Sequence, residues 1–152
     1  MTHRMLITAL LAWGVALQTY AQEEGTVITW KTLGEVKFTE KYVEKYQDWF
    51  LFPNFGPTVK SLDGEKVAVK GYVIPIDLEE GLYALSAFPF AACFFCGAAG
   101  MESVMTLNMK KAKRRYNTDD VVTFKGVMRL NANDVEEFYY ILDNAEEVKF
   151  HY

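Results

Sequence analysis

The sequence predicts a mostly β fold, a small five-stranded OB-like barrel preceded by an N-terminal extension. The first observation is an alternation of apolar and polar residues over 66–74, which begins just after the turn signal Asp63-Gly64. The second is that four more strand-like segments follow within about 90 residues. The third is Gly71 inside the first strand, which allows a long strand to bend. Together these features are typical of a small closed barrel.

The first 21 residues predict a cleavable signal peptide. A polar start at His3 and Arg4 precedes an apolar run over 5–17, and residues 19–21 read Thr-Tyr-Ala. Small residues at the two positions that a signal peptidase reads place the cleavage before Gln22. The apolar run is shorter than the roughly 20 residues that a membrane-spanning helix needs. We therefore expect an exported protein of the periplasm, with secretion as the alternative, and no transmembrane segment in the mature chain.

Residues 22–60 are predicted to form an extension packed on a barrel domain of residues 61–152. Residues 26–30 are β-prone, and residues 40–50 have apolar side chains at helix-like spacing. The Pro-Asn-Phe-Gly-Pro run at 53–57 then breaks the chain. The aromatic residues of this extension could line a ligand groove, but we favour a role in fastening it to the barrel. They are Trp30, Tyr42, Tyr46, Trp49, Phe50, Phe52 and Phe55.

Within the barrel domain, Val67, Val69, Gly71 and Val73 share one face of the first strand, which Pro75 is expected to end. The other expected strands are 82–88, 103–109, 121–130 and 140–148, with a bend at Gly126. Asn133 is expected to cap a single helical turn, with Glu136 three residues on.

Composition argues against most enzyme classes. The whole chain has a net charge of −4, and loss of Arg4 with the signal peptide leaves −5. An acidic exported domain is a poor candidate for binding nucleic acid. Of the two histidines, His3 leaves with the signal peptide and His151 is next to last, so a histidine base has little support. The mature serines have no histidine in a suggestive pattern, which argues against a serine hydrolase. We therefore favour a non-enzymatic module.

The run Cys93-Phe94-Phe95-Cys96-Gly97 is the one motif with chemistry in it. It falls on a loop between the second and third predicted strands, where functional sites often lie. Four interpretations stay open. A Cys93–Cys96 disulfide ranks first, because exported proteins meet an oxidising compartment and the cysteine count is even.

A metal site ranks second, because Cys-x-x-Cys-Gly resembles half of a zinc knuckle. Tetrahedral zinc needs four ligands, so others would have to come from His151, Asp77, Glu102, water or a second subunit. Thiolates with Met101 or Met105 nearby would instead suit Cu(I). Zinc and copper are thus the candidate cofactors, although the sequence requires neither.

Inert thiols in an apolar environment rank third. Thiol-disulfide redox activity ranks last, because redox Cys-x-x-Cys motifs usually open a helix in a thioredoxin-like unit. Gly97 and Gly100 make a poor helix start here.

Several segments resemble a family of small exported bacterial proteins filed under a domain of unknown function. The matching segments are 28–30, 61–64, 71–77, 91–93 and 121–129, and Leu62-Asp63-Gly64 to Gly71-Tyr72-Val73-Ile74-Pro75 is the most specific stretch. Much of that family follows the first cysteine with a histidine and prolines, whereas Phe94 follows Cys93 here, so this chain looks like a two-cysteine branch. The resemblance implies an OB-like barrel. It also implies an envelope partner such as a transporter component, because some members accompany transporters and metal-handling proteins.

A basic cluster interrupts the acidic sequence: Lys110, Lys111, Lys113, Arg114 and Arg115. It could contact anionic lipid headgroups, phosphates or an acidic partner, although a solvated turn is the more common role of such a run. The sequence as a whole predicts an exported, non-enzymatic binding or accessory module of the cell envelope. Its candidate site is the loop of Cys93 and Cys96; a metal-binding or metal-delivery protein and a redox protein are the alternatives.

Overall fold

The computed structural model describes residues 25–110 and 114–149. The predicted signal peptide, Lys111, Lys113 and His151 lie outside these residues. In order, the strands are β1 (Thr26–Ile28), β2 (Val36–Val43), β3 (Asp48–Phe55), β4 (Lys66–Asp77), β5 (Leu82–Ser86), β6 (Val104–Met109), β7 (Val121–Leu130) and β8 (Tyr140–Val148). Two short helices, α2 (Trp30–Leu33) and α3 (Pro57–Lys60), and the 3-10 turns η1 (Phe90–Ala92), η2 (Phe94–Cys96) and η3 (Met101–Ser103) connect them. No helix in the described ranges is long and apolar enough to cross a membrane.

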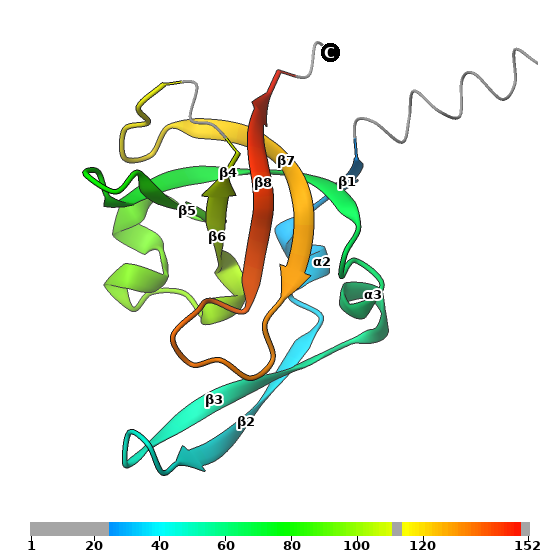
Figure 1. The fold of residues 1–152 in the computed structure, drawn as a ribbon, viewed down its shortest axis with the longest axis vertical. Coiled ribbons are helices and arrows are strands. Elements are labelled where there is room, and N and C mark those ends of the chain that lie inside the picture. The colour runs from blue at the N-terminus through cyan, green and yellow to red at the C-terminus, as the bar shows by residue number, and fades with distance from the viewer. Residues whose placement is uncertain (1–24, 111–113, 150–152) are drawn as a thin grey trace, which may run out of the picture.

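Five of the strands close into a barrel, which confirms the predicted fold class. Their order is β4-β5-β6-β8-β7, and pairing of β7 back onto β4 closes the ring. Strands β6 and β8 pair in parallel, whereas the other barrel pairs are antiparallel. Strand β1 adds to the barrel from outside by pairing in parallel with the first half of β4 (Figure 1).

The barrel core follows from the alternation along β4. Val67, Val69 and Val73 are fully buried, as the sequence pattern predicts. Gly71 shares their inward face, and a Cβ atom there would lie 2.6 Å from the carbonyl oxygen of Ser86. A glycine is therefore needed where β4 bends across β5. The largest fully buried side chains that pack against this face include Phe124 of β7 and Tyr140 of β8.

The prediction that Pro75 ends the first strand is wrong. Pro75 pairs with Tyr83, and β4 continues to Asp77 after an irregularity in register. Pairing of β4 with β7 stops at Tyr72, so from there on β5 is the barrel neighbour of β4. A proline is tolerated there because its missing N–H group can face the unpaired side of the strand.

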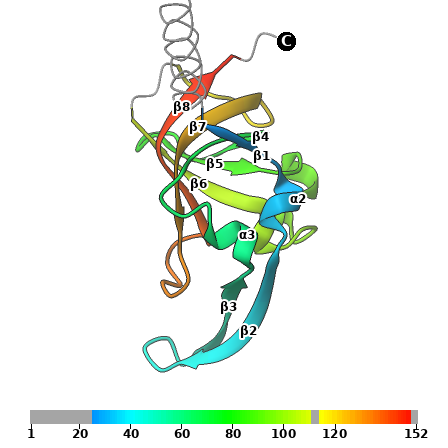
Figure 2. The same cartoon turned by 90° about the vertical axis from the view of Figure 1, so that its right-hand side faces the viewer.

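The helix predicted within 40–50 is also wrong, because this segment forms a β-hairpin. Strands β2 and β3 pair with Tyr42 opposite Trp49, and the two rings contact each other at 5.7 Å between centroids. Gln47 adopts a positive φ of 52° in the turn. The helix-like spacing arose because aromatic residues of two strands and their turn were read as one segment. Figure 2 shows the hairpin extending away from the barrel.

The helical turn expected at Asn133 is absent as well. The segment between β7 and β8 is a loop built around the buried side chain of Asn131. Its Oδ1 atom accepts hydrogen bonds from the backbone N–H groups of Asn133 and Asp134 at 3.1 and 2.9 Å. Its Nδ2 atom donates to the carbonyl oxygens of Asp134 and Glu137 at 2.6 and 3.1 Å. The buried side chain of Asn131 thus pairs with backbone groups on both sides of the loop and holds it in a non-helical conformation.

Residues 25–60 share the hydrophobic core of the barrel. Leu33 and Val59 are fully buried in the same cluster as the barrel residues, and Phe55 packs on Tyr140. The Tyr140 hydroxyl donates to the carbonyl oxygen of Leu33 at 2.6 Å, and Trp30 Nε1 donates to that of Lys70 at 2.8 Å. Some aromatic residues of the extension therefore fasten it to the barrel.

Candidate functional site

The two cysteines lie on a long loop between β5 and β6, where η1, η2 and η3 follow one another. The Phe90 N–H group donates to Asp119 Oδ1 at 2.7 Å, which attaches the loop to the turn before β7. Gly97 ends η2 with a φ of 71°, in the left-handed region that glycine adopts without steric cost. The predicted location of the motif, between the second and third barrel strands, is therefore confirmed.

Both thiols point at the same backbone atom. Cys93 Sγ donates to the carbonyl oxygen of Phe90 at 3.0 Å, and Cys96 Sγ donates to the same oxygen at 2.9 Å. Cys93 is buried, whereas Cys96 is exposed, and both are free thiols in the structure. A shared acceptor keeps the two sulfurs close to each other. The predicted disulfide is not present here and stays a prediction.

The described residues supply no complete metal site. Among residues 25–110 and 114–149, no group of three or more histidine, cysteine, aspartate or glutamate side chains lies together. Asp77 Oδ1 instead accepts from the N–H groups of Glu79 and Glu80 in its own turn. Met105 is fully buried in the barrel core. Asp77 and Met105 thus make other contacts, and the structure brings together only the two sulfurs by a shared contact in the described chain.

Aromatic side chains surround the cysteine pair. Phe94 packs against Ile74, Ala84 and Val104 of the barrel wall. The rings of Phe94, Phe95 and Phe138 contact one another edge to face, with centroids 5.6 to 6.1 Å apart. Three rings of the loop remain largely exposed: Phe88 at 46%, Phe90 at 44% and Phe95 at 38%. The exposed Cys96 thus shares its loop with three exposed aromatic rings.

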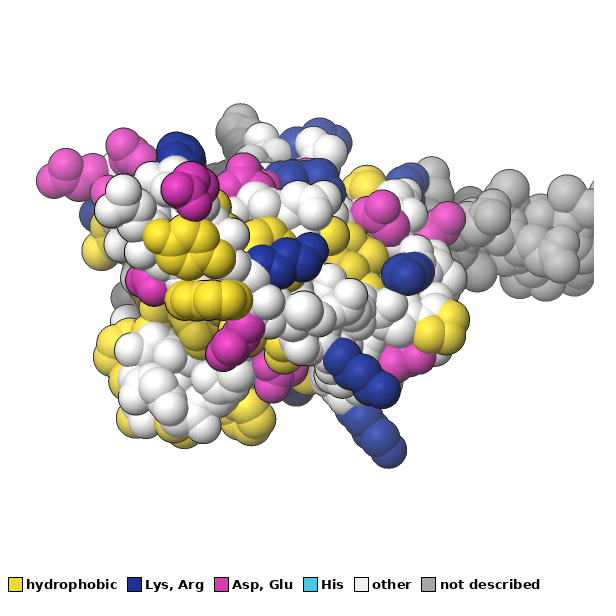
Figure 3. Space-filling model, turned by 90° about the horizontal axis from the view of Figure 1, so that it is seen from below, with side chains coloured by type: hydrophobic (Ala, Val, Ile, Leu, Met, Phe, Trp, Pro, Cys, Tyr) yellow, Lys and Arg dark blue, Asp and Glu magenta, His cyan; other side chains and the backbone are white. Residues whose placement is uncertain are grey.

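The β2–β3 hairpin presents a second group of aromatic residues. Tyr42 and Trp49 are both exposed near its tip. Lys45 forms an ion pair with Glu136 at 3.0 Å, and the Tyr46 hydroxyl donates to the same carboxylate. These contacts tie the hairpin to the loop before β8. Figure 3, which views this end of the molecule, shows hydrophobic side chains gathered among charged ones.

Of the predicted basic cluster, Lys110, Arg114 and Arg115 lie within the described residues. Arg114 pairs with Asp120 at 2.8 Å and with Glu147 at 3.4 Å, and its guanidinium lies 4.4 Å from the centre of the Tyr116 ring. Burial, followed by a hydrogen bond to Glu147, raises the pKa of Tyr116 to about 12. Arg114 is therefore held by a local structural network.

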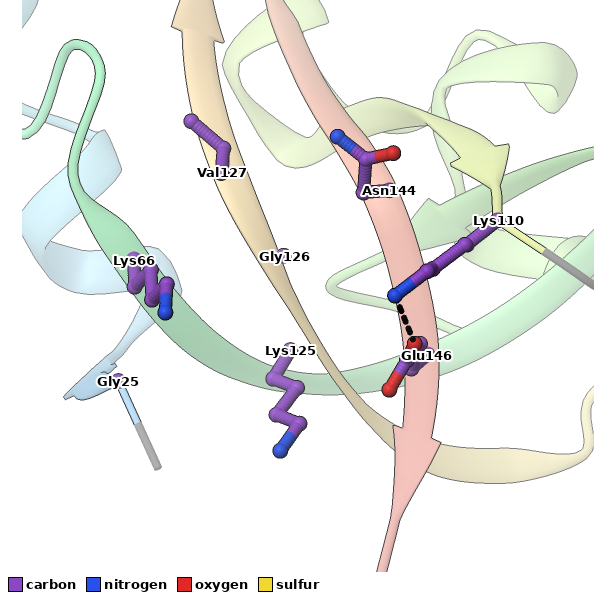
Figure 4. A pocket seen from close by; sticks show the side chains of 8 residues that line it. All are labelled: Gly25, Lys66, Lys110, Lys125, Gly126, Val127, Asn144 and Glu146. Atoms are coloured by element: carbon purple, nitrogen blue, oxygen red, sulfur yellow. Dashed lines mark ion pairs between the residues drawn. The ribbon is translucent and has the colours of Figure 1, made fainter. Parts of the chain in front are cut away.

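Lys110 takes part in a different arrangement, which sequence reasoning missed. It pairs with Glu146 at 3.3 Å and lines a cavity of about 350 Å³ together with Lys66 and Lys125 (Figure 4). The three lysines are far apart in the sequence and carry no common pattern. Strand pairing alone brings them together.

Comparison with known proteins supports the fold. No family model matches the sequence, and no curated protein matches it either. A similar structure is the crystal structure of a DUF3299 family protein from Pseudomonas aeruginosa PAO1, at 13% identity and a TM-score of 0.53. The match covers 84% of this chain and 98% of that one. The chain has the fold of that protein. A small family of unknown function thus has the same barrel, whereas the matching segments and the two-cysteine branch stay expectations.

Proposed function

We propose that the protein is an exported, non-enzymatic binding module of the cell envelope, which contacts a partner such as a transporter component through the loop of Cys93 and Cys96. The observation that carries this proposal is the exposure of Phe88, Phe90 and Phe95 on one loop around an exposed thiol. Grouped exposed apolar side chains mark interaction sites, because water contact at such a group is unfavourable and burial against a partner removes it.

The loop is also held in place before any partner binds. Its backbone is attached through Asp119, and Phe94 anchors it in the barrel wall. A preorganised loop loses little conformational entropy on binding, which favours recognition.

The serine hydroxyl groups support a binding role over hydrolysis. Ser61 Oγ donates to the carbonyl oxygen of Thr58, and Ser103 Oγ donates to that of Gly100. Ser86 Oγ accepts from the N–H group of Phe88. Each hydroxyl therefore completes a local turn, and none is paired with a base in the described chain.

Site-specific photo-crosslinking in the native cell tests the proposal. A photoreactive side chain at Phe95 is expected to give a discrete crosslinked product with an envelope protein. The same side chain at the exposed Lys60 serves as the control and is expected to give none. Equal crosslinking at both positions, or none at Phe95, contradicts the proposal, as does rapid turnover of a disulfide substrate by the purified protein.

We further propose that export converts the free thiols into a Cys93–Cys96 disulfide that shapes the loop. Support comes from the shared contact of both thiols with the Phe90 carbonyl oxygen. Intact mass spectrometry of protein from the envelope is expected to show a chain beginning at Gln22. Its mass should be lower by two hydrogens and return on reduction. The Cys96→Ser variant should lack this change, and a fully reduced wild-type protein would contradict the disulfide.

A metal-binding role is the second candidate, and the convergence of the two sulfurs also favours it. Native mass spectrometry without chelator distinguishes the metal site from the disulfide. The metal site is supported if the wild-type protein carries zinc or copper and both of its thiols are reduced after unfolding. The Cys93→Ser variant should then have lost the metal. A metal-free protein with the disulfide excludes it.

A further inference from the structure

A cavity of about 350 Å³ opens on the outer face of the barrel, where three lysines from different segments line it. Lys66 belongs to β4, Lys125 belongs to β7, and Lys110 directly follows β6. Figure 4 shows the three side chains around Gly126. The barrel topology has thus gathered three ammonium groups in a chain whose net charge is negative.

Only part of this positive charge is compensated. Lys110 pairs with Glu146, whereas Lys66 and Lys125 have no ion pair within the part of the chain that the structure describes. Three ammonium groups and one carboxylate leave two positive charges at the cavity. Because like charges held together repel, a bound anion would stabilise this arrangement.

Backbone forms part of the cavity wall, because Gly126 lines it. A Cβ atom at Gly126 would point toward the core, 2.7 Å from the carbonyl oxygen of Asp143 and 2.8 Å from the buried side chain of Leu142. Crowding between β7 and β8 therefore requires glycine. Asn144 also lines the cavity, and its amide is a further hydrogen-bond donor. The space suits a compact anionic group such as a phosphate or a carboxylate.

An apolar hollow of about 590 Å³ lies further along the same strands. Val27, Trp30, Tyr72 and Val121 are among its lining residues. Val27 is 66% exposed and Val121 is 53% exposed, which is unusual for valines on paired strands. These side chains leave an apolar surface open to solvent.

The cavity and the hollow both lie on the outward face of β4. Residues 66, 68, 70 and 72 alternate with the core residues, so Lys66 lies at the cationic end and Tyr72 at the apolar end. Six residues of strand separate these two positions by about 20 Å. Ala68 lies between them and is fully buried, with Val27 of β1 on one side and Lys125 of β7 on the other.

We propose that this outer face binds an anionic amphiphile. The anionic group binds among Lys66, Lys125 and Lys110, and the apolar chain lies in the hollow beside Tyr72 and Val121. Three lysines line the cavity, whereas Lys70 is the one lysine that lines the hollow, so charge complementarity favours the anionic end at the cavity. The apolar residues of the hollow then set the direction of the ligand along β4. The inference goes beyond the proposed function, because these strands are separate from the loop of Cys93 and Cys96.

Isothermal titration of the purified protein with dodecyl phosphate, below its micelle concentration, tests the inference. Dodecyl phosphate is expected to bind at least about tenfold more tightly than inorganic phosphate or zwitterionic dodecylphosphocholine, because each of these lacks one of the two interactions. Added salt is expected to weaken the binding.

Two variants test the two ends of the site. The double variant Lys66→Gln/Lys125→Gln is expected to bind dodecyl phosphate about tenfold more weakly. The exposed pair Lys37→Gln/Lys60→Gln changes the net charge equally and should leave binding unchanged. Val121→Ser should weaken the binding of dodecyl phosphate but leave the binding of inorganic phosphate unchanged. All five side chains concerned are at least partly exposed, and thermal unfolding checks that each variant is folded.

Several results would overturn the inference. Equal affinity for inorganic phosphate would make the cavity a simple phosphate site, and equal affinity for dodecylphosphocholine would remove the role of charge. Unchanged binding in Lys66→Gln/Lys125→Gln would place the ligand elsewhere. Binding to vesicles of anionic phospholipid without binding of monomeric dodecyl phosphate would identify a membrane-contact surface instead.

Discussion

Asp143 on β8 shows how a single carboxylate connects three strands of the barrel. Its Oδ2 atom accepts from Arg129 Nε of β7 at 2.8 Å, and its Oδ1 atom accepts from Asn108 Nδ2 of β6 at 2.7 Å. Partial burial alone would raise the pKa of Asp143. The hydrogen bonds from Arg129 and Asn108 outweigh that effect and hold the pKa below its usual range.

The lowered pKa predicts that Asp143 contributes to acid stability. A carboxylate whose pKa is lower in the folded state stabilises the protein above its unfolded pKa of about 3.9. That contribution is lost as the pH falls through the folded pKa. Asp143→Asn should therefore lower the urea midpoint at pH 7 and flatten its decline in acid. The control Glu40→Gln, at an exposed position, should show the same dependence of the urea midpoint on pH as the wild type. The same result for Asp143→Asn would show that the Asp143 carboxylate does not contribute to acid stability.

At the scale of elements, a bulge in β8 opposite Gly126 of β7 decides how the barrel closes. The register of β7 against β8 shifts between Lys125 and Val127, so that Gly126 lies opposite two residues of β8, Asn144 and Ala145. Gly126 pairs with Val67 of β4 on its other side. Gly126 thus lies where the carbonyl oxygen of Asp143 comes close to β7, and the bulge in β8 increases the local twist between the two strands.

Gly126→Ala is predicted to destabilise the barrel by about 1–3 kcal/mol, because its Cβ atom would meet backbone that cannot rotate away. The free energy of unfolding from urea titration measures the loss. Gly34→Ala is the control, because Gly34 has a φ of −67° and its Cβ atom would lie 3.3 Å from its nearest neighbour. Equal stability changes in the two variants would show that crowding at the bulge is unimportant.

At the scale of the whole molecule, extension and barrel share one hydrophobic core. Leu33, Phe55 and Val59 contribute to the same core as the barrel strands. The buried hydroxyl of Tyr140 also needs the carbonyl oxygen of Leu33 as its acceptor. Separation of the two parts would expose this apolar surface and leave the hydroxyl without its acceptor.

We therefore predict that a chain of residues 61–152 does not unfold cooperatively, as near-UV circular dichroism during heating would show. The control keeps the extension but replaces residues 41–50 of the hairpin with Asn-Gly, a pair suited to a two-residue turn. This control should keep a cooperative transition, because the hairpin tip lies outside the core. A sharp transition in the truncated chain would show that the barrel is stable alone.

Sequence reasoning succeeded where a local pattern has one structural meaning. The bounds of β7 and β8 match the predicted segments 121–130 and 140–148. In β7 a long alternating run buries one face of the strand. It failed at residues 40–50, where two short strands and a turn happened to imitate helical spacing. The Cys93–Cys96 loop was located correctly because two cysteines in a short motif are visible without any fold.

The sequence by itself determined the barrel strands, the inward face of β4 and the place of the cysteine loop. Each of these depends on residues near one another in the chain. Only the tertiary structure decided that Lys66, Lys110 and Lys125 share a cavity, that both thiols meet the Phe90 carbonyl oxygen, and that the extension completes the core. Contacts between strands that are distant in the sequence bring the three lysines together and form the shared core. The path of the loop backbone sets the positions of the two thiols. Local residue patterns specify neither.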